Sequence, residues 1–328
     1  MVQEAPVKPP YEQVEIISSN ALALQAYELG VQEYINGKEA KMETKEQVLA
    51  KLEHSSLDEL WIQFLKIQSD LFFEKEFAPI FDQTWWCEAH EVLEIGSGNG
   101  DLLAKMSTTF PDKTYVGLEL KPAYVSHSQQ QYQSDHLTFV EGDAECLRED
   151  FSNRFDVVIL RLTLQHLKQP KIVLEHASRY LKKGGHVFIV ESHDASRQSS
   201  YPTPILDKAV QELNHQNRNL GKGNRLISLE VQRELQSQTL PLASYFCVKM
   251  SNLDDEGRDS PNFPQVVISS LEAGPSYRDY YLMFLQILNK QWNIPIDFEQ
   301  AYEEGSYFVE NKAAWLRSGK HLLLLEKK

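Results

Sequence analysis

The sequence predicts an α/β chain built on a doubly wound, mainly parallel sheet. Short apolar strands alternate with segments of helical spacing between residues 91 and 192. The segment 155–160 is apolar on both faces, which is typical of a central strand in a parallel sheet. A glycine-rich turn joins the first of these strands to the next helix. Turns of this kind bind ligands at the edge of such a sheet.

The segment before the first strand is predicted to be helical. Residues 1–13 contain three prolines and are expected to form an extended arm. From residue 18 to residue 81 apolar residues recur at helical spacing, as in Leu57, Leu60 and Phe64. We therefore assign residues 1–85 to an N-terminal helical cap.

A strand, a glycine-rich turn and a helix follow one another in the segment 91–105, EVLEIGSGNGDLLAK. The turn carries alternating glycines, Gly96, Gly98 and Gly100. Glycine lets the backbone come close to a ligand, and the amides at the helix start point into the same space. Glu94 adds an acceptor for an ammonium or hydroxyl group. The dinucleotide fingerprint G-x-G-x-x-G would need its third glycine where Asp101 stands, which argues against NAD.

Polar residues follow the later strands. The second strand, 114–118, ends in Glu119, where nucleotide-like cofactors have their ribose hydroxyls held by a carboxylate. A solvated glutamate at a strand end is the alternative. The third strand is followed by Asp143, in a Gly-Asp pair that favours a turn. The fourth strand runs directly into residues 161–167, and the fifth covers 186–192.

Four features follow one another in this order: the glycine-rich turn, Glu119, Asp143 and the segment that leaves the fourth strand. Together they resemble the class I S-adenosylmethionine (SAM) dependent methyltransferases over about residues 90–195. The acid-x-Gly-x-Gly-x-Gly pattern is similar to their first motif, and the stretch 164–167 resembles the ubiquinone/menaquinone-type small-molecule enzymes. The resemblance implies a Rossmann-like seven-stranded sheet with an antiparallel last strand. Candidates for the last two strands are 244–250 and 321–326.

The resemblance also implies a cofactor, SAM, with S-adenosylhomocysteine (SAH) as its product. The helical insert before the last strand departs from the family's minimal pattern, and the order of elements along the chain suggests the following domain organisation. The SAM-binding core covers 86–263, a helical insert acting as a lid covers 264–316, and 317–328 supplies the last strand. Cofactor-binding candidates are Glu94, Gly96, Ser97, Gly98, Gly100, Glu119, Leu120, Asp143, Ala144, Arg161 and Leu162.

Methyl transfer from a sulfonium is an in-line displacement, so the protein mainly positions the acceptor and excludes water. Groups at the ends of strands four and five face the reaction site of an open α/β sheet. They supply the catalytic candidates His166, Glu191 and His193. Candidates that line the substrate site are Gln165, Asp194, Tyr201, Tyr277 and Tyr281. For the histidines a packing role, and for the tyrosines attachment of the insert to the sheet, are the alternatives.

Charge and composition limit the partners. The formal net charge of −14 argues against nucleic acid and favours small or cationic substrates. The three cysteines show no C-x-x-C pairing, and no carboxylate leaves strand four as magnesium-dependent catechol-type enzymes need, so no metal is expected. No signal peptide and no run of eighteen apolar residues is present, so a soluble, cytoplasmic protein without a membrane span is expected.

Four functions remain open at this stage. The first is a SAM-dependent methyltransferase (EC 2.1.1.-) that methylates an O, N or C atom of a small molecule. The second is a protein side-chain methyltransferase, and the third is a SAM-binding regulatory protein without transfer activity. An NAD-dependent dehydrogenase comes last because of Asp101. The identity of the acceptor and the oligomeric state stay open.

Overall fold

The computed structural model describes residues 43–328, except 222, 239–240, 261–262 and 264. The chain divides into two compact units, Met1–Val48 and Leu49–Lys328. The predicted arm at 1–13 and the first predicted helices lie outside the described residues. Helix α2 (Lys45–His54) is the first described element.

Helix α3 (Leu57–Phe81) begins at a capping box. The Ser56 amide donates to Glu59 Oε2 at 2.8 Å, and the Glu59 amide donates to Ser56 Oγ at 3.3 Å. These two bonds satisfy amides that the first turn of a helix leaves without a partner. The helix runs for 25 residues with Pro79 in its last turn, and α4 (Thr84–Cys87) connects it to the sheet.

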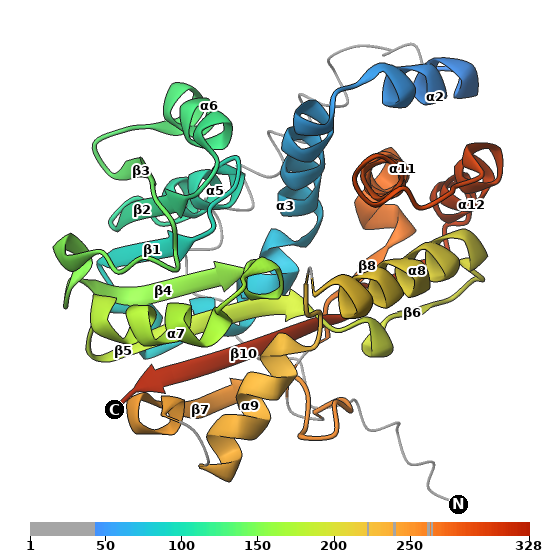
Figure 1. Ribbon diagram of the computed structural model, residues 1–328. Coiled ribbons are helices and arrows are strands. Elements are labelled where there is room, and N and C mark those ends of the chain that lie inside the picture. Colours follow the sequence, from blue (N-terminus) through green and yellow to red (C-terminus); the bar gives the residue numbers. More distant parts are fainter. Residues whose placement is uncertain (1–42, 222, 239–240, 261–262, 264) are drawn as a thin grey trace, which may run out of the picture. The chain divides into compact units, whose positions relative to one another are not determined.

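The core is a seven-stranded sheet in the order β3-β2-β1-β4-β5-β10-β7 (Figure 1). Its strands are β1 (Glu91–Ile95), β2 (Thr114–Glu119), β3 (Leu137–Glu141), β4 (Phe155–Arg161), β5 (Leu181–Ser192), β7 (Phe246–Ser251) and β10 (Lys320–Lys327). Only β10 runs antiparallel to its neighbours, β5 and β7. The predicted fold class, with its antiparallel last strand, is confirmed.

Helices cover both faces of this sheet. Besides α3 they are α5 (Asp101–Thr109), α6 (Pro122–Tyr132), α7 (Pro170–Tyr180), α9 (Ile227–Ser237) and α10 (Leu242–Tyr245). The remaining helices, α8 (Pro204–Leu220), α11 (Ser270–Trp292) and α12 (Phe298–Glu310), pack on one another. Single 3-10 turns are η1 (Glu149–Phe151), η2 (Leu164–His166) and η3 (Asp194–Ser196).

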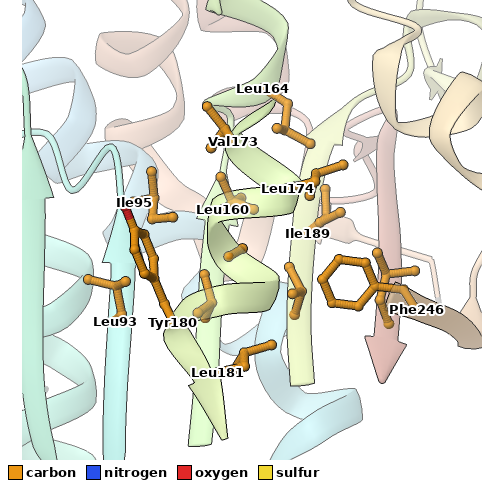
Figure 2. Packing of buried hydrophobic residues seen from close by; sticks show 14 of the residues in the cluster. Leu93, Ile95, Leu160, Leu164, Val173, Leu174, Tyr180, Leu181, Ile189 and Phe246 are labelled. Carbon is orange, nitrogen blue, oxygen red and sulfur yellow. The ribbon is translucent and has the colours of Figure 1, made fainter. Parts of the chain in front are cut away.

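A large apolar cluster lies between the sheet and helices α7, α9 and α10 (Figure 2). Ile189 of β5 faces this cluster and is fully buried. Its neighbour Phe188 faces the other side, where its ring meets Phe77 of α3 edge-on at 5.3 Å. Burying side chains of this size contributes roughly 1.5–3 kcal/mol each. Alternate residues of β5 therefore hold helices to both faces of the sheet.

A second, three-stranded sheet was not predicted. It joins β6 (Gln198–Ser199), β9 (Trp315–Arg317) and β8 (Val267–Ser269) in antiparallel order β6-β9-β8. The chain leaves the core for α8 through β6, enters α11 through β8 and returns through β9. The helical insert predicted at 264–316 therefore contains two strands besides α11 and α12.

Helices α8, α11 and α12 pack into one cap. The Glu304 carboxylate of α12 accepts hydrogen bonds from the Ile205 amide of α8 at 2.9 Å and from the Tyr281 hydroxyl of α11 at 2.7 Å. Helix α3 packs on α11, with the rings of Phe64 and Tyr280 stacked at 4.8 Å. Among the described residues no helix has the length and apolar character needed to cross a membrane.

Candidate active site

The strand order reverses between β1 and β4, which run parallel with Ile95 opposite Leu160. In open α/β sheets ligands bind beyond the carboxyl ends of the strands at such a reversal. The loop that follows β1 and the residues that follow β4 meet at this edge. The Thr163 hydroxyl donates to the carbonyl of Ile95 at 3.1 Å and fixes the two exits against each other.

The loop after β1 adopts a backbone that only glycine takes up readily. Gly96, Gly98 and Gly100 have φ values of +76°, +55° and +85°. A Cβ on Gly96 would lie 2.5 Å from Thr163 Oγ1, and one on Gly100 would lie 2.8 Å from the Cβ of Ser128. Both the conformation and the close neighbours therefore require glycine.

Glu119, at the tip of β2, is bonded to the glycine loop. Its Oε2 accepts from the Gly98 amide at 2.9 Å, and its Oε1 accepts from the Lys121 amide at 2.9 Å. Each oxygen keeps a lone pair after these bonds. The side chain is half-buried, so both oxygens can accept from a ligand as well.

Two polar groups beside the loop are buried without a partner among the described residues. They are Oε2 of Glu94 and Oγ of Ser97. Burial raises the pKa of Glu94 to about 8, against the opposing charge of Arg161. A buried carboxyl oxygen without a partner costs free energy until a donor reaches it. The site thus fits a ligand that brings an ammonium or hydroxyl group.

The residues after β3 lie at the edge of the candidate cofactor site. Oδ1 of Asp143 accepts from the Glu145 amide at 2.8 Å, which closes the turn that the Gly-Asp pair favours. Ala144 packs against the apolar cluster, and its carbonyl faces His176 Nδ1 at 3.0 Å. Leu120, directly after Glu119, is 61% exposed. The exposed leucine can pack against the face of a ligand's aromatic ring, and the acidic turn can accept hydrogen bonds from the edge of that ring.

Arg161, the last residue of β4, belongs to a buried ionic cluster. Its Nε donates to Glu76 Oε2 of α3 at 2.6 Å, and Lys320 Nζ of β10 lies 3.3 Å from Glu76 Oε1. All three side chains are at most 5% exposed. Burial lowers the pKa of Lys320 to about 8, although Glu76 opposes this shift. Leu162 follows with φ +55°, and its amide donates to the Val190 carbonyl at 2.7 Å.

Glu191, near the end of β5, is fully buried and caps turn η2. Its Oε1 accepts from the Leu164 amide at 2.6 Å, while Oε2 has no partner among the described residues. Burial raises the pKa of Glu191 to about 7, against the hydrogen bonds that the backbone of residues 163–165 donates. Glu191 therefore holds the turn that carries Gln165 and His166.

His166 is exposed to solvent, although many protein atoms lie around its ring. Neighbouring atoms displace water from the ring and lower its pKa to about 4, and the charges of Arg225 and Lys121 act in the same direction. The imidazole is therefore neutral at pH 7.

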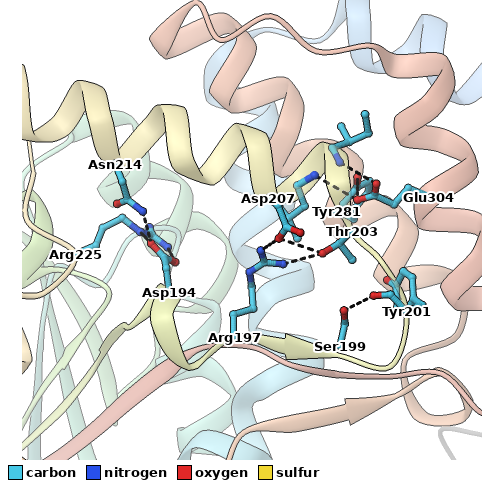
Figure 3. Close-up of polar contacts among 12 residues, drawn as sticks. Asp194, Arg197, Ser199, Tyr201, Thr203, Asp207, Asn214, Arg225, Tyr281 and Glu304 are labelled. Atoms are coloured by element: carbon cyan, nitrogen blue, oxygen red, sulfur yellow. Dashed lines mark hydrogen bonds and ion pairs between the residues drawn. The ribbon is translucent and has the colours of Figure 1, made fainter. Parts of the chain in front are cut away.

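Arg225 is the residue of this site that sequence reasoning missed. Its Nε and Nη2 donate to the two oxygens of Asp194 at 2.6 Å each, and its Nη1 donates to Gln165 Oε1 at 3.3 Å. Asn214 of α8 donates to Asp194 as well, at 2.9 Å (Figure 3). Arg225 lies in the long segment after strand five, and no motif in that segment marks it.

Other candidates lie elsewhere. His193 is buried against the loop that contains Gly257, where a Cβ on that glycine would lie 3.0 Å from its Nε2. Tyr277 and Tyr281 are buried in the cap, where the Tyr277 ring lies 4.1 Å from that of Phe308. Tyr201 packs on α12 beside them. These contacts favour packing roles, and roles for these four residues in catalysis or substrate binding stay predictions.

Residues 88–243 match the family model described as "Methyltransferase domain". Residues 88–243, just under half of the chain, are therefore similar to a methyltransferase domain. This match supports the predicted enzyme class and, with it, SAM as the cofactor.

Known proteins of similar sequence carry methyltransferase names. The malonyl-[acyl-carrier protein] O-methyltransferase of Paenibacillus sp. (strain JDR-2) is 29% identical over 99 residues, which are 29% of this chain and 36% of that protein. The ubiquinone biosynthesis O-methyltransferase of Pseudomonas fluorescens (strain Pf0-1) is 28% identical over 125 residues, which are 35% of this chain and 54% of that protein. The chain thus matches about a third to a half of the length of these relatives.

Among solved structures, the plantazolicin methyltransferase BpumL in complex with SAH is 15% identical, with a TM-score of 0.42. The comparison covers 94% of this chain and 100% of that one.

Proposed function

We propose that the whole chain is a SAM-dependent methyltransferase that acts on a small organic acceptor. The observation that carries this proposal is the pairing of Glu119 with the Gly98 amide at 2.9 Å, at the edge where the sheet order reverses. This hydrogen bond joins the carboxylate that would bind the ribose to the glycine loop whose backbone would contact the rest of the cofactor. The domain match supports the same reaction.

In this proposal the cofactor is held by groups that have unused hydrogen-bonding capacity. Glu94 Oε2, which has no partner among the described residues, accepts from the ammonium of SAM. Glu119 accepts from the ribose hydroxyls, and Leu120 and Asp143 contact the adenine. Arg161 neutralises the carboxylate of the methionine part.

SAM supplies a methyl group on a positively charged sulfur, which leaves as the neutral sulfide of SAH when the acceptor attacks in line. The chain's own residues position the acceptor and exclude water. Glu191 holds turn η2 through the Leu164 amide, so that Gln165 and His166 face the acceptor. His166, with its pKa lowered to about 4, serves as a neutral hydrogen-bonding group more readily than as a base.

The cap supplies the other wall. Tyr280 of α11 stacks on Phe64, and its hydroxyl accepts from Gln68 Nε2 at 3.4 Å. Gln68 also accepts from Arg161 through its Oε1 at 3.4 Å. A chain of polar contacts therefore runs from the end of β4 to the aromatic face of α11. An aromatic wall with a few polar groups suits a small organic acceptor.

Two measurements test the proposal. Isothermal titration calorimetry should show that SAM and SAH bind to the purified chain. Incubation with tritiated-methyl SAM and a fractionated metabolite extract should then place the label in the small-molecule fraction. Label found only in added protein would favour the protein side-chain enzyme, and binding without transfer would favour the regulatory protein. If neither SAM nor SAH binds, the proposal is wrong.

A further inference from the structure

Arg225 is held so that part of its guanidinium stays free. An arginine side chain has five N–H donors in one plane. Asp194 uses one on Nε and one on Nη2, and Gln165 uses one on Nη1. The contacts among the described residues therefore leave one N–H on each terminal nitrogen. Free N–H groups on the two terminal nitrogens are the donors with which an arginine binds a carboxylate in a bidentate manner.

The support behind this guanidinium is rigid. Asp194 Oδ2 also accepts from Asn214 of α8 (Figure 3). The Asn224 amide donates to the Gln165 carbonyl at 2.9 Å. Burial opposes the ionisation of Asp194, but the charge of Arg225 and the hydrogen bonds from Arg225 and Asn214 together outweigh it, and the pKa of Asp194 is lowered. The pair thus stays ionised. Its side chains are only 17% and 20% exposed, so a ligand would meet Arg225 in a setting with little water.

The hydrogen bond to Gln165 places Arg225 beside the candidate acceptor site. Its positive charge acts on His166 and Lys320, whose pKa values it lowers, and on Tyr280 of the cap, whose phenolate it would stabilise. These groups come from η2, β10 and α11, which border the space beyond strands four and five.

The local charge of this space differs from that of the whole chain. Three cations, Arg161, Arg225 and Lys320, are paired with two carboxylates, Glu76 and Asp194. Burial raises the pKa of Glu94 to about 8 and that of Glu191 to about 7, so before the cofactor binds Glu94 is mostly protonated at neutral pH and Glu191 about half protonated. Cations are therefore gathered in this space, although the formal net charge of the chain is −14.

We propose that the methyl acceptor bears a carboxylate, and that the two free N–H groups of Arg225 bind that carboxylate between His166 and Tyr280. This inference rests on the proposed function and names the substrate class of the same site. Arg225 is then the residue that selects acids over their neutral analogues, because a fork of two charge-assisted hydrogen bonds discriminates against an uncharged amide.

The test uses the full chain saturated with SAH. Binding of hexanoate, decanoate, benzoate and 4-hydroxybenzoate is measured by calorimetry and compared with binding of the corresponding amides and of hexyl phosphate. At least one acid should bind ten or more times as tightly as its amide and more tightly than the phosphate. No preference for any acid, or a preference for the phosphate, would overturn the proposal.

Variants tie the preference to the residue. Arg225→Lys keeps the charge that Asp194 needs but lacks the fork, and should lose at least tenfold in affinity for the preferred acid. The double variant Arg225→Met, Asp194→Asn removes both charges and should lose as much. Arg218→Met removes an exposed arginine of α8 as the matched control and should change nothing.

The two proposals fail separately. Retained SAH affinity in the Arg225 variants shows that the fold and the cofactor site are intact. If SAH binds and the variants keep the acid preference, only the role of Arg225 is wrong. If SAH does not bind to the unsubstituted chain, the proposed function itself fails.

Discussion

The carboxylate of Glu119 and the amide of Gly98 are joined by a 2.9 Å hydrogen bond across two neighbouring strand exits. The bond makes Glu119 both a support of the glycine loop and a candidate ligand of the ribose. Removing the carboxylate would affect both roles. Only the role as ribose ligand contributes directly to the binding of the cofactor.

Glu119→Ala should weaken SAM binding by well over tenfold. The substitution removes two hydrogen bonds to ribose hydroxyls, each charge-assisted and contributing roughly 1.5–3 kcal/mol. Calorimetry with SAM measures the change. Glu141→Ala is the matched control, because Glu141 is exposed and lies opposite Glu119 in the register of β2 and β3. Unchanged SAM affinity in a folded Glu119→Ala protein would refute the ribose assignment.

Gly96→Ala should destabilise the protein more than Gly184→Ala does. The two glycines have almost the same φ, +76° and +74°, so alanine at either position costs about 1–2 kcal/mol of backbone strain. A Cβ meets nothing within 4 Å at Gly184, but lies 2.5 Å from Thr163 Oγ1 at Gly96. Overpacking of this kind costs roughly 1–3 kcal/mol more. Urea unfolding of the two variants gives the difference, and equal losses would show that Thr163 moves aside without cost.

SAM affinity should rise as the pH rises toward about 8. The pKa of Glu94 is raised to about 8 by burial, so the group is protonated at neutral pH, while an ammonium partner needs the ionised form. Binding should therefore release a proton, which calorimetry detects as a dependence of the binding enthalpy on the buffer. Glu94→Gln should remove most of both effects. If the SAM affinity of the unsubstituted chain does not depend on pH, Glu94 does not bind the ammonium of SAM.

The same shift predicts how stability depends on pH in the absence of SAM. The folded-state pKa of Glu94, about 8, lies above the reference value of 4.5, so the folded state binds more protons than the unfolded state between these values. The free energy of unfolding should therefore fall as the pH rises from about 4.5 to about 8. Glu191, raised to about 7, adds to the fall in the lower part of this range. Urea unfolding at a series of pH values, with Glu94→Gln for comparison, measures it.

Glu76→Gln should cost far more stability than a surface substitution of the same kind. It leaves Arg161 and Lys320 buried without their carboxylate, and removing one partner of a buried pair costs about 3–5 kcal/mol. Lys320, whose pKa is already lowered to about 8, can lose its proton and so keep the cost near the lower value. Asp70→Asn removes the carboxylate that Lys66 and Lys105 share near the surface, and should cost less than about 1 kcal/mol for each exposed pair. Similar losses in both variants would show that the cluster is open to water.

Much of the core could be predicted from the sequence because its signals are local. The strand before the glycine turn, the alternating glycines and the acid at the tip of the second strand lie within about thirty residues of one another. A short apolar run marks each strand of the parallel sheet in the sequence. The handedness of the crossover connections then restricts the order of the strands in the sheet. The reversal of strand order beside Gly96 follows from that arrangement.

The acceptor site had no such local signal. Glu76 reaches Arg161 across 85 residues and Arg225 reaches Gln165 across 60, and both contacts depend on how the added helices pack on the sheet. Tyr280 and Tyr281 are neighbours in sequence, yet one faces α3 and the other α12. Helical spacing predicts that both are apolar contacts, but it does not say which partner each one meets.

The sequence by itself determined the sheet, the glycine turn and the acid beside it, because these depend on backbone geometry within single strand–turn–helix units. Only the tertiary structure decided that Arg225 joins the site and that His193 turns toward the loop of Gly257. Those positions are set by long-range packing of the segments after strand five, where burial and charge pairing select one arrangement among many that the local pattern allows.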